Sequence, residues 1–252
     1  MDQYRADLVA NHALMVAAQV LETRFAGADF AFVAGSIMRR QGTVGSDIDM
    51  VVLYPRLEWA WRESLVEDGF PIEAFVHDPT TLEVFLGRDA ENGRAIMVNM
   101  VAEGRIVGSR VEGAAALRAR ARGLLKAGPA PLDGERLEFM LYLLSDLADD
   151  LRGRRDREEV LAIAVTLYPK LIDLILLGRG LWSGAGKWLP RRLRAADAAL
   201  ADQLSLAMAD AVAGDGAAML ALCERTLAEN GGPVFAGFRR VSDVAGLAGP
   251  RL

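Results

Sequence analysis

Cysteine is almost absent from this chain, since Cys223 is the single one among 252 residues. One thiol cannot form an intramolecular disulfide, and it cannot supply a cysteine-based zinc site. Its place in the apolar segment AMLALCERTL predicts a buried, inert side chain rather than a nucleophile. The cysteine content therefore excludes a disulfide-stapled secreted scaffold and indicates a reducing compartment.

The chain also lacks long hydrophobic runs. No uninterrupted run reaches the roughly 18 apolar residues that a membrane-spanning helix needs. The opening residues, MDQYRADLVAN, have neither the positive region nor the apolar core of a signal peptide. We therefore expect a cytoplasmic protein with no membrane partner.

A surplus of positive charge is missing as well. Lysine and arginine number 29 against 34 aspartates and glutamates, which gives a net charge of −5. Proteins that hold long nucleic acids more often carry a basic excess or a basic stripe. Arginines do cluster locally, but such runs are more often solvated helix faces. The local arginine clusters are LRARARG, LRGRRDR and LPRRLRAAD. The composition as a whole thus argues against a nucleic-acid partner.

What the chain has in quantity is apolar residues, at 52% of the total, which is enough to bury two moderate cores. The segment KAGPAPLDGE, residues 126–135, is rich in proline and glycine and separates a mixed first part from a helical remainder. The sequence therefore predicts an α+β domain over residues 1–125, a linker over 126–135, and an all-α helical bundle domain over 136–252.

Hydrophobic periodicity predicts the elements of both parts. In the first part we expect two main helices, at residues 3–24 and from about 80 or 81 onward, and strands at 30–35, 47–53, 71–78 and 105–108. In the second part we expect helices at about 136–152, 157–178, 190–213 and 217–229.

Residues 34–53, AGSIMRRQGTVGSDIDMVVL, place two carboxylates on one predicted strand. Side chains alternate faces along a strand, so Asp47 and Asp49 share a face at a spacing of roughly 6.6 Å. Aspartate is depleted from strands, so packing alone does not explain the pair. Carboxylates together with waters and substrate phosphates are the usual ligands of Mg²⁺. The pair indicates either a cation site or an edge strand whose polar face is simply wet.

A glycine turn precedes the carboxylate pair. The strand FAFVAG ends at Gly35, and Ser36 opens a short predicted helical run, SIMRRQ, at an N-cap position. A glycine followed by a helix N-terminus can bind phosphate through backbone N–H groups, and Ser36 adds a hydroxyl. Gly-Ser after a strand is also ordinary turn chemistry. Next to the carboxylates, however, it favours a phosphate-binding turn.

The pattern Gly35-Ser36, ten residues, then Asp47-Ile48-Asp49 resembles the signature of the nucleotidyltransferase superfamily. The resemblance implies a mixed sheet flanked by helices, with Mg²⁺ as cofactor and ATP or another nucleoside triphosphate as co-substrate. It also implies a third acid on a later strand, for which the segment PIEAFVHD supplies Glu73. Alternation buries the neighbours of Glu73, so this residue is either the third acid beside the metal or a solvated edge residue.

Within the superfamily, the chain is most similar to antibiotic nucleotidyltransferases of the kanamycin type and their relatives. That likeness implies transfer of a nucleoside monophosphate, AMP in the first instance, to a hydroxyl of a small molecule such as an aminoglycoside, with release of pyrophosphate, and hence antibiotic resistance. It also makes a homodimer plausible. Because fold does not choose substrate, two alternatives stay open. One is a toxin-like regulator that modifies protein or RNA, and the other is a catalytically silent nucleotide-binding sensor.

The helical half offers candidate catalytic groups through the same likeness. In the kanamycin enzyme a carboxylate of the matching helix is the general base, and the alignment places Asp149 there, with Asp146 one turn earlier. A solvated acidic face is the alternative, in which case Glu73 takes the proton. Pattern alone gives the helix an apolar stripe that includes Leu144 and Leu151 and leaves Asp149 opposite.

Lys170 is the predicted nucleotide-phosphate lysine. It directly follows Pro169 on an otherwise apolar helix, where an unpaired ammonium is costly unless it meets water, a carboxylate or phosphate. The alternative is a lysine that extends along its stem to the surface. Lys187 is a second choice. Neither histidine, His12 nor His77, has metal-ligand spacing.

Overall fold

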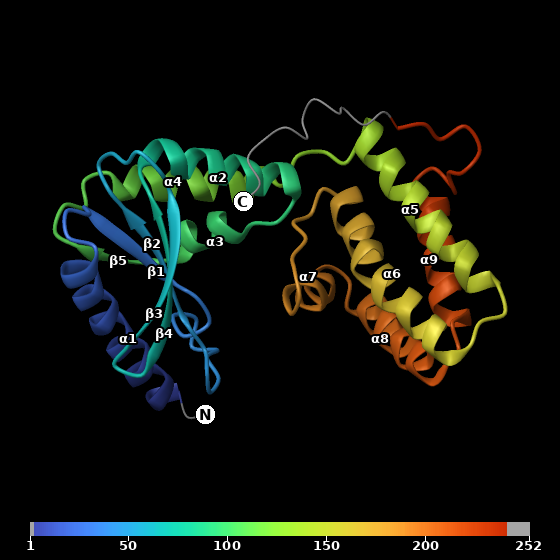
Figure 1. The fold of residues 1–252 in the computed structure, drawn as a ribbon, viewed down its shortest axis with the longest axis horizontal. Helices are drawn as coiled ribbons and strands as arrows, with labels where there is room; N and C mark the ends of the chain where they lie inside the picture. The colour runs from blue at the N-terminus through green and yellow to red at the C-terminus, as the bar shows by residue number, and fades with distance from the viewer. Residues whose placement is uncertain (1–2, 241–252) are drawn as a thin grey trace. The chain divides into compact units, whose positions relative to one another are not determined.

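The computed structural model describes residues 3–240 and divides the chain into two compact units, residues 1–130 and 131–252. The division falls inside the segment 126–135 that the sequence predicts as a linker. The expected fold class is confirmed. The first unit is a five-stranded mixed sheet with helices, and the part of the second unit that the structure describes is helical (Figure 1).

The sheet has the strand order β3-β4-β2-β1-β5. Strand β2 runs parallel to β4, and the remaining neighbours are antiparallel. Two inner strands, β1 and β2, are almost wholly buried. Strand β3 is a largely exposed edge strand that was not predicted from the sequence. The strands are β1 (Phe30–Ala34), β2 (Ile48–Leu53), β3 (Trp61–Glu67), β4 (Phe70–His77) and β5 (Arg105–Gly108).

Helix α1 covers one face of the sheet, and α2 and α3 cover the other (Figure 1). Helix α1 buries small side chains, among them Ala13 and Ala17, against Val33, Met50 and Ala74 of the sheet. These short side chains let the helix approach the strands closely. The opposite face packs against α2 and α3, with α4 behind them. The helices are α1 (Gln3–Arg24), α2 (Pro79–Asn92), α3 (Ile96–Glu103) and α4 (Ala114–Ala127).

Polar groups at the ends of α2 fix the connections around it. Asp78 caps the helix by accepting from Thr81 N at 2.7 Å, and it also accepts from Leu57 N at 3.1 Å. These hydrogen bonds, with that from Thr81 first, lower the pKa of Asp78. Near the other end, Asp89 accepts from Val98 N at 2.9 Å and so caps α3, while its burial raises its pKa to about 6.

The second unit packs its described helices around α6. The predicted helix over 190–213 is two helices, because Asp197 adopts an extended backbone between them and caps α8 by accepting from Leu200 N at 3.0 Å. Pro169 lies inside α6, but the helix continues past it without a break. The helices are α5 (Gly134–Arg152), α6 (Arg157–Gly178), α7 (Trp188–Ala196), α8 (Ala198–Ala213) and α9 (Ala217–Glu229).

By length and composition, α6 could cross a membrane, contrary to the expectation from uninterrupted apolar runs. Its most apolar window of 18 residues has a mean hydropathy of 2.1, and half of that window is buried inside the protein. A core helix of a helical bundle has the same length and composition, because it must be apolar on most of its circumference. Leu167, Leu171 and Ile172 of α6 are fully buried in the core of the unit.

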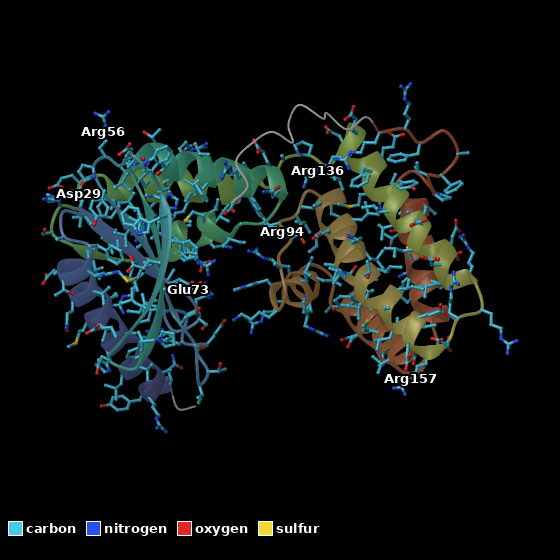
Figure 2. All side chains as sticks on the ribbon, in the orientation of Figure 1. Asp29, Arg56, Glu73, Arg94, Arg136 and Arg157 are labelled. Carbon is cyan, nitrogen blue, oxygen red and sulfur yellow. The ribbon has the colours of Figure 1, made fainter. Side chains whose placement is uncertain are left out.

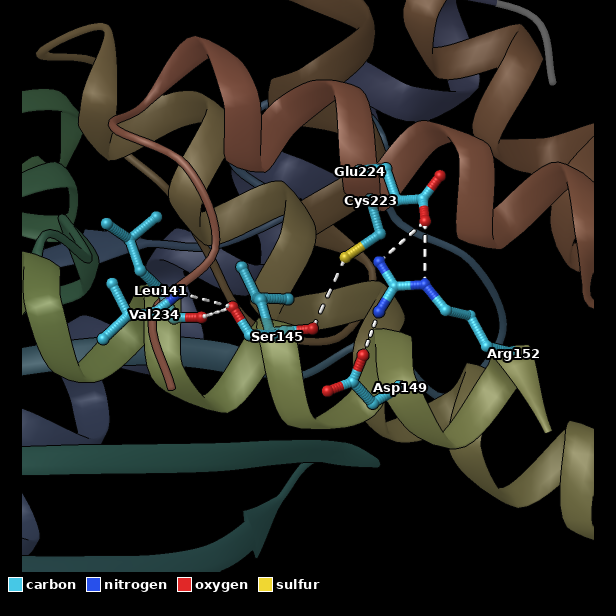
Figure 3. A network of polar contacts seen from close by, with 8 residues as sticks. Leu141, Ser145, Asp149, Arg152, Cys223, Glu224 and Val234 are labelled. Carbon is cyan, nitrogen blue, oxygen red and sulfur yellow. Dashed lines mark hydrogen bonds and ion pairs between the residues drawn. The ribbon is translucent and has the colours of Figure 1, made fainter. Parts of the chain in front are cut away.

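The sole cysteine lies in this core, as the sequence predicts. Cys223 on α9 is fully buried, and its Sγ lies 3.7 Å from the carbonyl oxygen of Leu144 (Figure 3). Burial raises the pKa of the thiol to about 12. The thiolate needed for nucleophilic or redox chemistry is therefore not formed at neutral pH.

The chain after α9 covers part of α5. The hydroxyl of Ser145 accepts from Val234 N at 3.0 Å and donates to the carbonyl oxygen of Leu141 at 2.7 Å (Figure 3). Phe238 stacks on Tyr142 with 4.1 Å between ring centroids. Ser145 is therefore buried on α5, and the ring of Phe238 covers that of Tyr142.

Candidate active site

The site begins where β1 ends. Gly35 has a φ of +95°, and a Cβ atom at this position would lie only 2.6 Å from Oδ2 of Asp49. Glycine is therefore required here both by the backbone conformation and by the space that the Asp49 carboxylate occupies. The prediction that Gly35 adjoins the carboxylate strand agrees with this contact.

The run after Gly35 is a series of turns and not the predicted helix. Arg39 N donates to Gly35 O at 3.2 Å, but Gln41 N reaches back to Ser36 O at 2.8 Å, which is one residue beyond the helical pattern. Arg40 has a left-handed φ of 61°, and this conformation stops helix growth. A phosphate site here would use N–H groups of a turn and would gain no helix dipole.

Both arginines of this turn are engaged in ion pairs with flanking helices. Arg39 pairs with Glu103 of α3 at 3.1 Å, and Arg40 pairs with Asp7 of α1. A surface cavity of about 470 Å³ adjoins Arg40, but the acids of β2 and β4 do not line it. The arginines thus fix the turn between the two helix layers.

A hydroxyl network holds the loop that returns to β2. Ser36 Oγ donates to Ser46 Oγ at 3.1 Å, and Ser46 Oγ also accepts from Thr43 N at 2.8 Å. Ser46 directly precedes Asp47, so the network ties the glycine turn to the start of the acidic strand. Sequence reasoning did not single out Ser46, because a serine in a glycine-containing loop has no distinctive pattern.

Three carboxylates converge beside this turn. In the strand register, Asp49 lies opposite Ala34 of β1 and opposite Glu73 of β4. Asp47 directly precedes β2, one residue outside the strand on which the sequence predicts it. One carboxylate oxygen from each of Asp47, Asp49 and Glu73 lies within 4.8 Å of the other two, and all three residues are partly buried. The structure thus brings together Asp47 and Asp49, which strand alternation places on one face, and Glu73, which the superfamily resemblance implies as the third acid.

The three acids fit a hard divalent cation. Two unit charges about 5 Å apart repel each other by roughly 3 kcal/mol at an effective dielectric constant of 20, so the cluster gains from a bound cation. Mg²⁺ prefers oxygen ligands and is usually held by a few carboxylates with waters and phosphates. No nitrogen or sulfur ligand belongs to the cluster, which favours Mg²⁺ over zinc.

A cation of the protein itself already contacts the cluster. The guanidinium of Arg62 on β3 lies 2.6 Å from Oε1 of Glu73, and Figure 2 shows where Glu73 lies in the first unit. Arg62 also lies over the ring of Phe75, 4.9 Å from its centroid. Arg62 could not be predicted from the sequence, because the strand that carries it has no clear apolar alternation. Only the β3–β4 pairing, with Arg62 opposite Phe75, shows that Arg62 lies on the same face of the sheet as Glu73.

The remaining predicted site residues lie in the second unit. Asp149 on α5 is exposed and pairs with Arg152, which also binds Glu224 of α9 at 2.8 Å (Figure 3). Asp146 is exposed, and Lys170 is partly buried on α6. Lys187 is exposed just before α7.

Neither histidine joins the acid cluster as a ligand. His12 on α1 lies 2.7 Å from Asp68. His77 at the end of β4 is 2% exposed, and its Nδ1 has no hydrogen-bond partner among the described residues. Burial lowers the pKa of His77 to about 4, so its ring is neutral at physiological pH and packs edge-on against Phe85.

Comparison with known proteins finds a resemblance among solved structures. No protein-family model and no curated protein matches the chain. A solved structure that resembles it is that of a nucleotidyltransferase-like protein from Exiguobacterium sibiricum, with a TM-score of 0.45 and 12% sequence identity. The match covers 85% of this chain and 77% of that one.

Proposed function

We propose that the protein is a Mg²⁺-dependent nucleotidyltransferase that moves a nucleoside monophosphate, AMP in the first instance, from a nucleoside triphosphate to a hydroxyl of a small molecule such as an aminoglycoside-like antibiotic. The observation that carries the proposal is the convergence of Asp47, Asp49 and Glu73 within 4.8 Å, beside the turn at Gly35. Three carboxylates next to a phosphate-binding turn are what metal-assisted phosphoryl transfer requires.

Each residue of the cluster has a proposed role. Asp47, Asp49 and Glu73 would hold Mg²⁺, which neutralises charge on the triphosphate when bound. The backbone at Gly35 and the hydroxyl of Ser36 bind the terminal phosphates. Most of the rate enhancement then comes from positioning and from neutralisation of charge, as in other phosphoryl transfers.

The proposed reaction is a displacement at the α-phosphorus, which needs neither an oxidant nor a further reactant. The oxygen of the acceptor hydroxyl bonds to the α-phosphorus, the bond from that phosphorus to the bridging oxygen breaks, and pyrophosphate leaves. The hydroxyl proton passes to a carboxylate, for which Glu73 and Asp149 are the two candidates. In the second unit, Lys170 is the proposed cation that binds phosphate. Asp149→Asn tests the role of Asp149 as the base, and Lys170→Met separately tests the role of Lys170 in phosphate binding.

Two properties of the chain support a small acceptor and a reducing compartment. The net charge of −5 disfavours a long anionic acceptor such as RNA. The chain has a single cysteine, so no disulfide within the chain can contribute to stability. We therefore extend the proposal to a cytoplasmic enzyme that acts on a small molecule.

The test is transfer of label from α-phosphate-labelled ATP in the presence of Mg²⁺. Acceptors are a panel of aminoglycosides and lincosamides and, separately, a cell extract. Asp47→Asn should lower transfer at least tenfold, because loss of a metal ligand or its support commonly costs that much. Glu22→Gln is the control variant, since Glu22 is an exposed acid on α1, across the sheet from the cluster.

The fraction that carries the label decides the acceptor. Label on a panel compound supports the antibiotic-type activity, whereas label in protein or RNA identifies a macromolecular acceptor of the same chemistry. Equal labelling by wild type and Asp47→Asn would refute the proposed site. Binding of ATP without pyrophosphate release in any fraction would indicate a sensor.

A further inference from the structure

The ion pair between Arg62 and Glu73 joins an edge strand to the acid cluster. Arg62 lies opposite Phe75 in the β3–β4 register, and Ser64 lies opposite Glu73. The arginine therefore reaches diagonally along the strands to place its Nη2 atom 2.6 Å from Oε1 of Glu73. One of the three carboxylates that would hold a divalent cation already has a cationic partner.

This ion pair is open to solvent and easily exchanged. The Arg62 side chain is 56% exposed and that of Glu73 is 31% exposed. Ion pairs at such surfaces contribute about 0–1 kcal/mol to stability, which a divalent cation held by three carboxylates can readily exceed. Loss of the pair should therefore leave the fold intact.

Phe75 keeps the guanidinium nearby when the pair opens. Arg62 lies 4.9 Å from the centroid of the Phe75 ring, within the range of a cation–π contact. The ring belongs to β4, two residues after Glu73 and on the same face of the sheet. After Glu73 turns to a metal ion, Arg62 thus remains beside the site with its donors available to an anion.

The charges of the cluster favour such an exchange. Three carboxylates carry a formal charge of −3, and Arg62 reduces this to −2 in the absence of metal. A divalent cation offers more charge at shorter range, but it brings the polyphosphate of a nucleotide with it. The planar guanidinium is well suited to bind phosphate oxygens, often in bidentate fashion.

We propose that Arg62 is an exchangeable counter-ion of the site. It holds Glu73 while no divalent cation is bound, and it transfers to the phosphates of the nucleoside triphosphate when Glu73 turns to the metal. This inference rests on the proposed function and adds a positioning and phosphate-binding residue to it. It predicts opposite effects of Arg62 on two affinities, because Arg62 competes with the bare metal and assists the metal–nucleotide complex.

Two binding measurements on the full chain test the inference, and neither depends on turnover. The first is titration of nucleotide-free protein with Mn²⁺, followed by electron paramagnetic resonance. The second is calorimetric titration, in Mg²⁺, with an ATP analogue whose α–β bridge is a methylene group. Arg62→Met removes the charged guanidinium but keeps an unbranched apolar stem. We expect it to bind Mn²⁺ about threefold to tenfold more tightly and the analogue at least fivefold more weakly.

A matched control comes from the same strand. Arg24 of α1 pairs with Glu63 of β3 at 2.7 Å, and Glu63 points to the opposite face of the sheet from Arg62. Arg24→Met therefore removes an ion pair of β3 without touching the acids, and it should leave both affinities unchanged. Arg62→Lys keeps the charge and should fall between wild type and Arg62→Met.

The outcomes separate this inference from the proposed function. Binding of Mn²⁺ by wild type that Asp47→Asn abolishes would establish the metal site irrespective of Arg62. If Arg62→Met then bound Mn²⁺ no more tightly than wild type, or bound the analogue equally well, the role of Arg62 would be refuted and the metal site would stand. Absence of Mn²⁺ binding by the wild-type protein would overturn both.

Discussion

A Cβ atom on Gly35 would lie 2.6 Å from Oδ2 of Asp49, so the turn after β1 and the acid of β2 are too close together to leave room for a methyl group. Gly35→Ala must displace the carboxylate or the turn. We expect at least a tenfold loss of Mn²⁺ affinity, measured by titration of the nucleotide-free variant.

The control for that variant is Gly69→Ala. Gly69 also has a positive φ, +76°, but a Cβ atom there would meet nothing within 4 Å. Both variants should lose about 1 kcal/mol of stability to backbone strain. Only Gly35→Ala should lose metal binding, and equal metal binding by both variants would show that the contact with Asp49 has no consequence.

The second prediction concerns stability without metal. Repulsion among the acids destabilises the metal-free fold, so Asp47→Asn should raise the free energy of unfolding by about 1 kcal/mol in chelator, the larger pairwise repulsion being screened by solvent. Glu73→Gln should gain less, because it also loses the ion pair with Arg62. Urea denaturation with EDTA measures both effects. A variant less stable than wild type by more than 1 kcal/mol would contradict the repulsion argument.

The third prediction is a loss of stability in acid that depends on His77. Burial lowers the pKa of His77 to about 4, whereas an unfolded histidine titrates near 6.5. The unfolded chain therefore binds a proton first, and stability from this group is present above pH 6.5 and is lost as the pH falls towards 4. His77→Phe removes this linkage. Relative to wild type, its free energy of unfolding should rise by about 3 kcal/mol between pH 7 and pH 4. A constant difference across that range would refute the assignment.

The fourth prediction has the opposite sign and concerns Asp89. Burial raises its pKa to about 6, above that of an unfolded aspartate, so its contribution is fully present below about pH 4 and is lost as the pH rises through 6. Asp89→Asn keeps an acceptor for Val98 N without the buried charge. It should be about 1–3 kcal/mol more stable than wild type at pH 8 and indistinguishable from it at pH 4. Chemical denaturation of wild type and variant at several pH values measures this difference in the free energy of unfolding. It also shows whether the opposite pH dependences of His77 and Asp89 offset each other in the wild type.

The acid cluster was predictable from sequence because it depends on two regular properties of strands. Alternation with a period of two places Asp47 and Asp49 on one face, and the buried neighbours of Glu73 fix its own face. The parallel pairing of β2 with β4 then sets Asp49 beside Glu73. The sequence alone predicts on which face of its strand each acid lies. The expectation that Glu73 joins Asp47 and Asp49 in one site came from the superfamily resemblance.

Other features depend on tertiary contacts that local pattern does not encode. The sequence of the turn after Gly35 predicts a helix, but the left-handed backbone of Arg40 prevents one. Arg39 and Arg40 form ion pairs with two different helices in this conformation. Ser145 is buried on α5 although its side chain is polar, because Val234 N supplies it with a hydrogen-bond partner. In both cases the decisive partner is distant in sequence.

Cys223 makes the molecule convenient for spectroscopy. Because its thiol is fully buried and its pKa is raised to about 12, maleimide reagents will not modify it under conditions in which an exposed thiol reacts. Val44, in the loop between Ser36 and Asp47, is fully exposed. A cysteine placed there could carry a fluorophore as the only label on the native background, and its emission would report ligand binding at the neighbouring acids in real time.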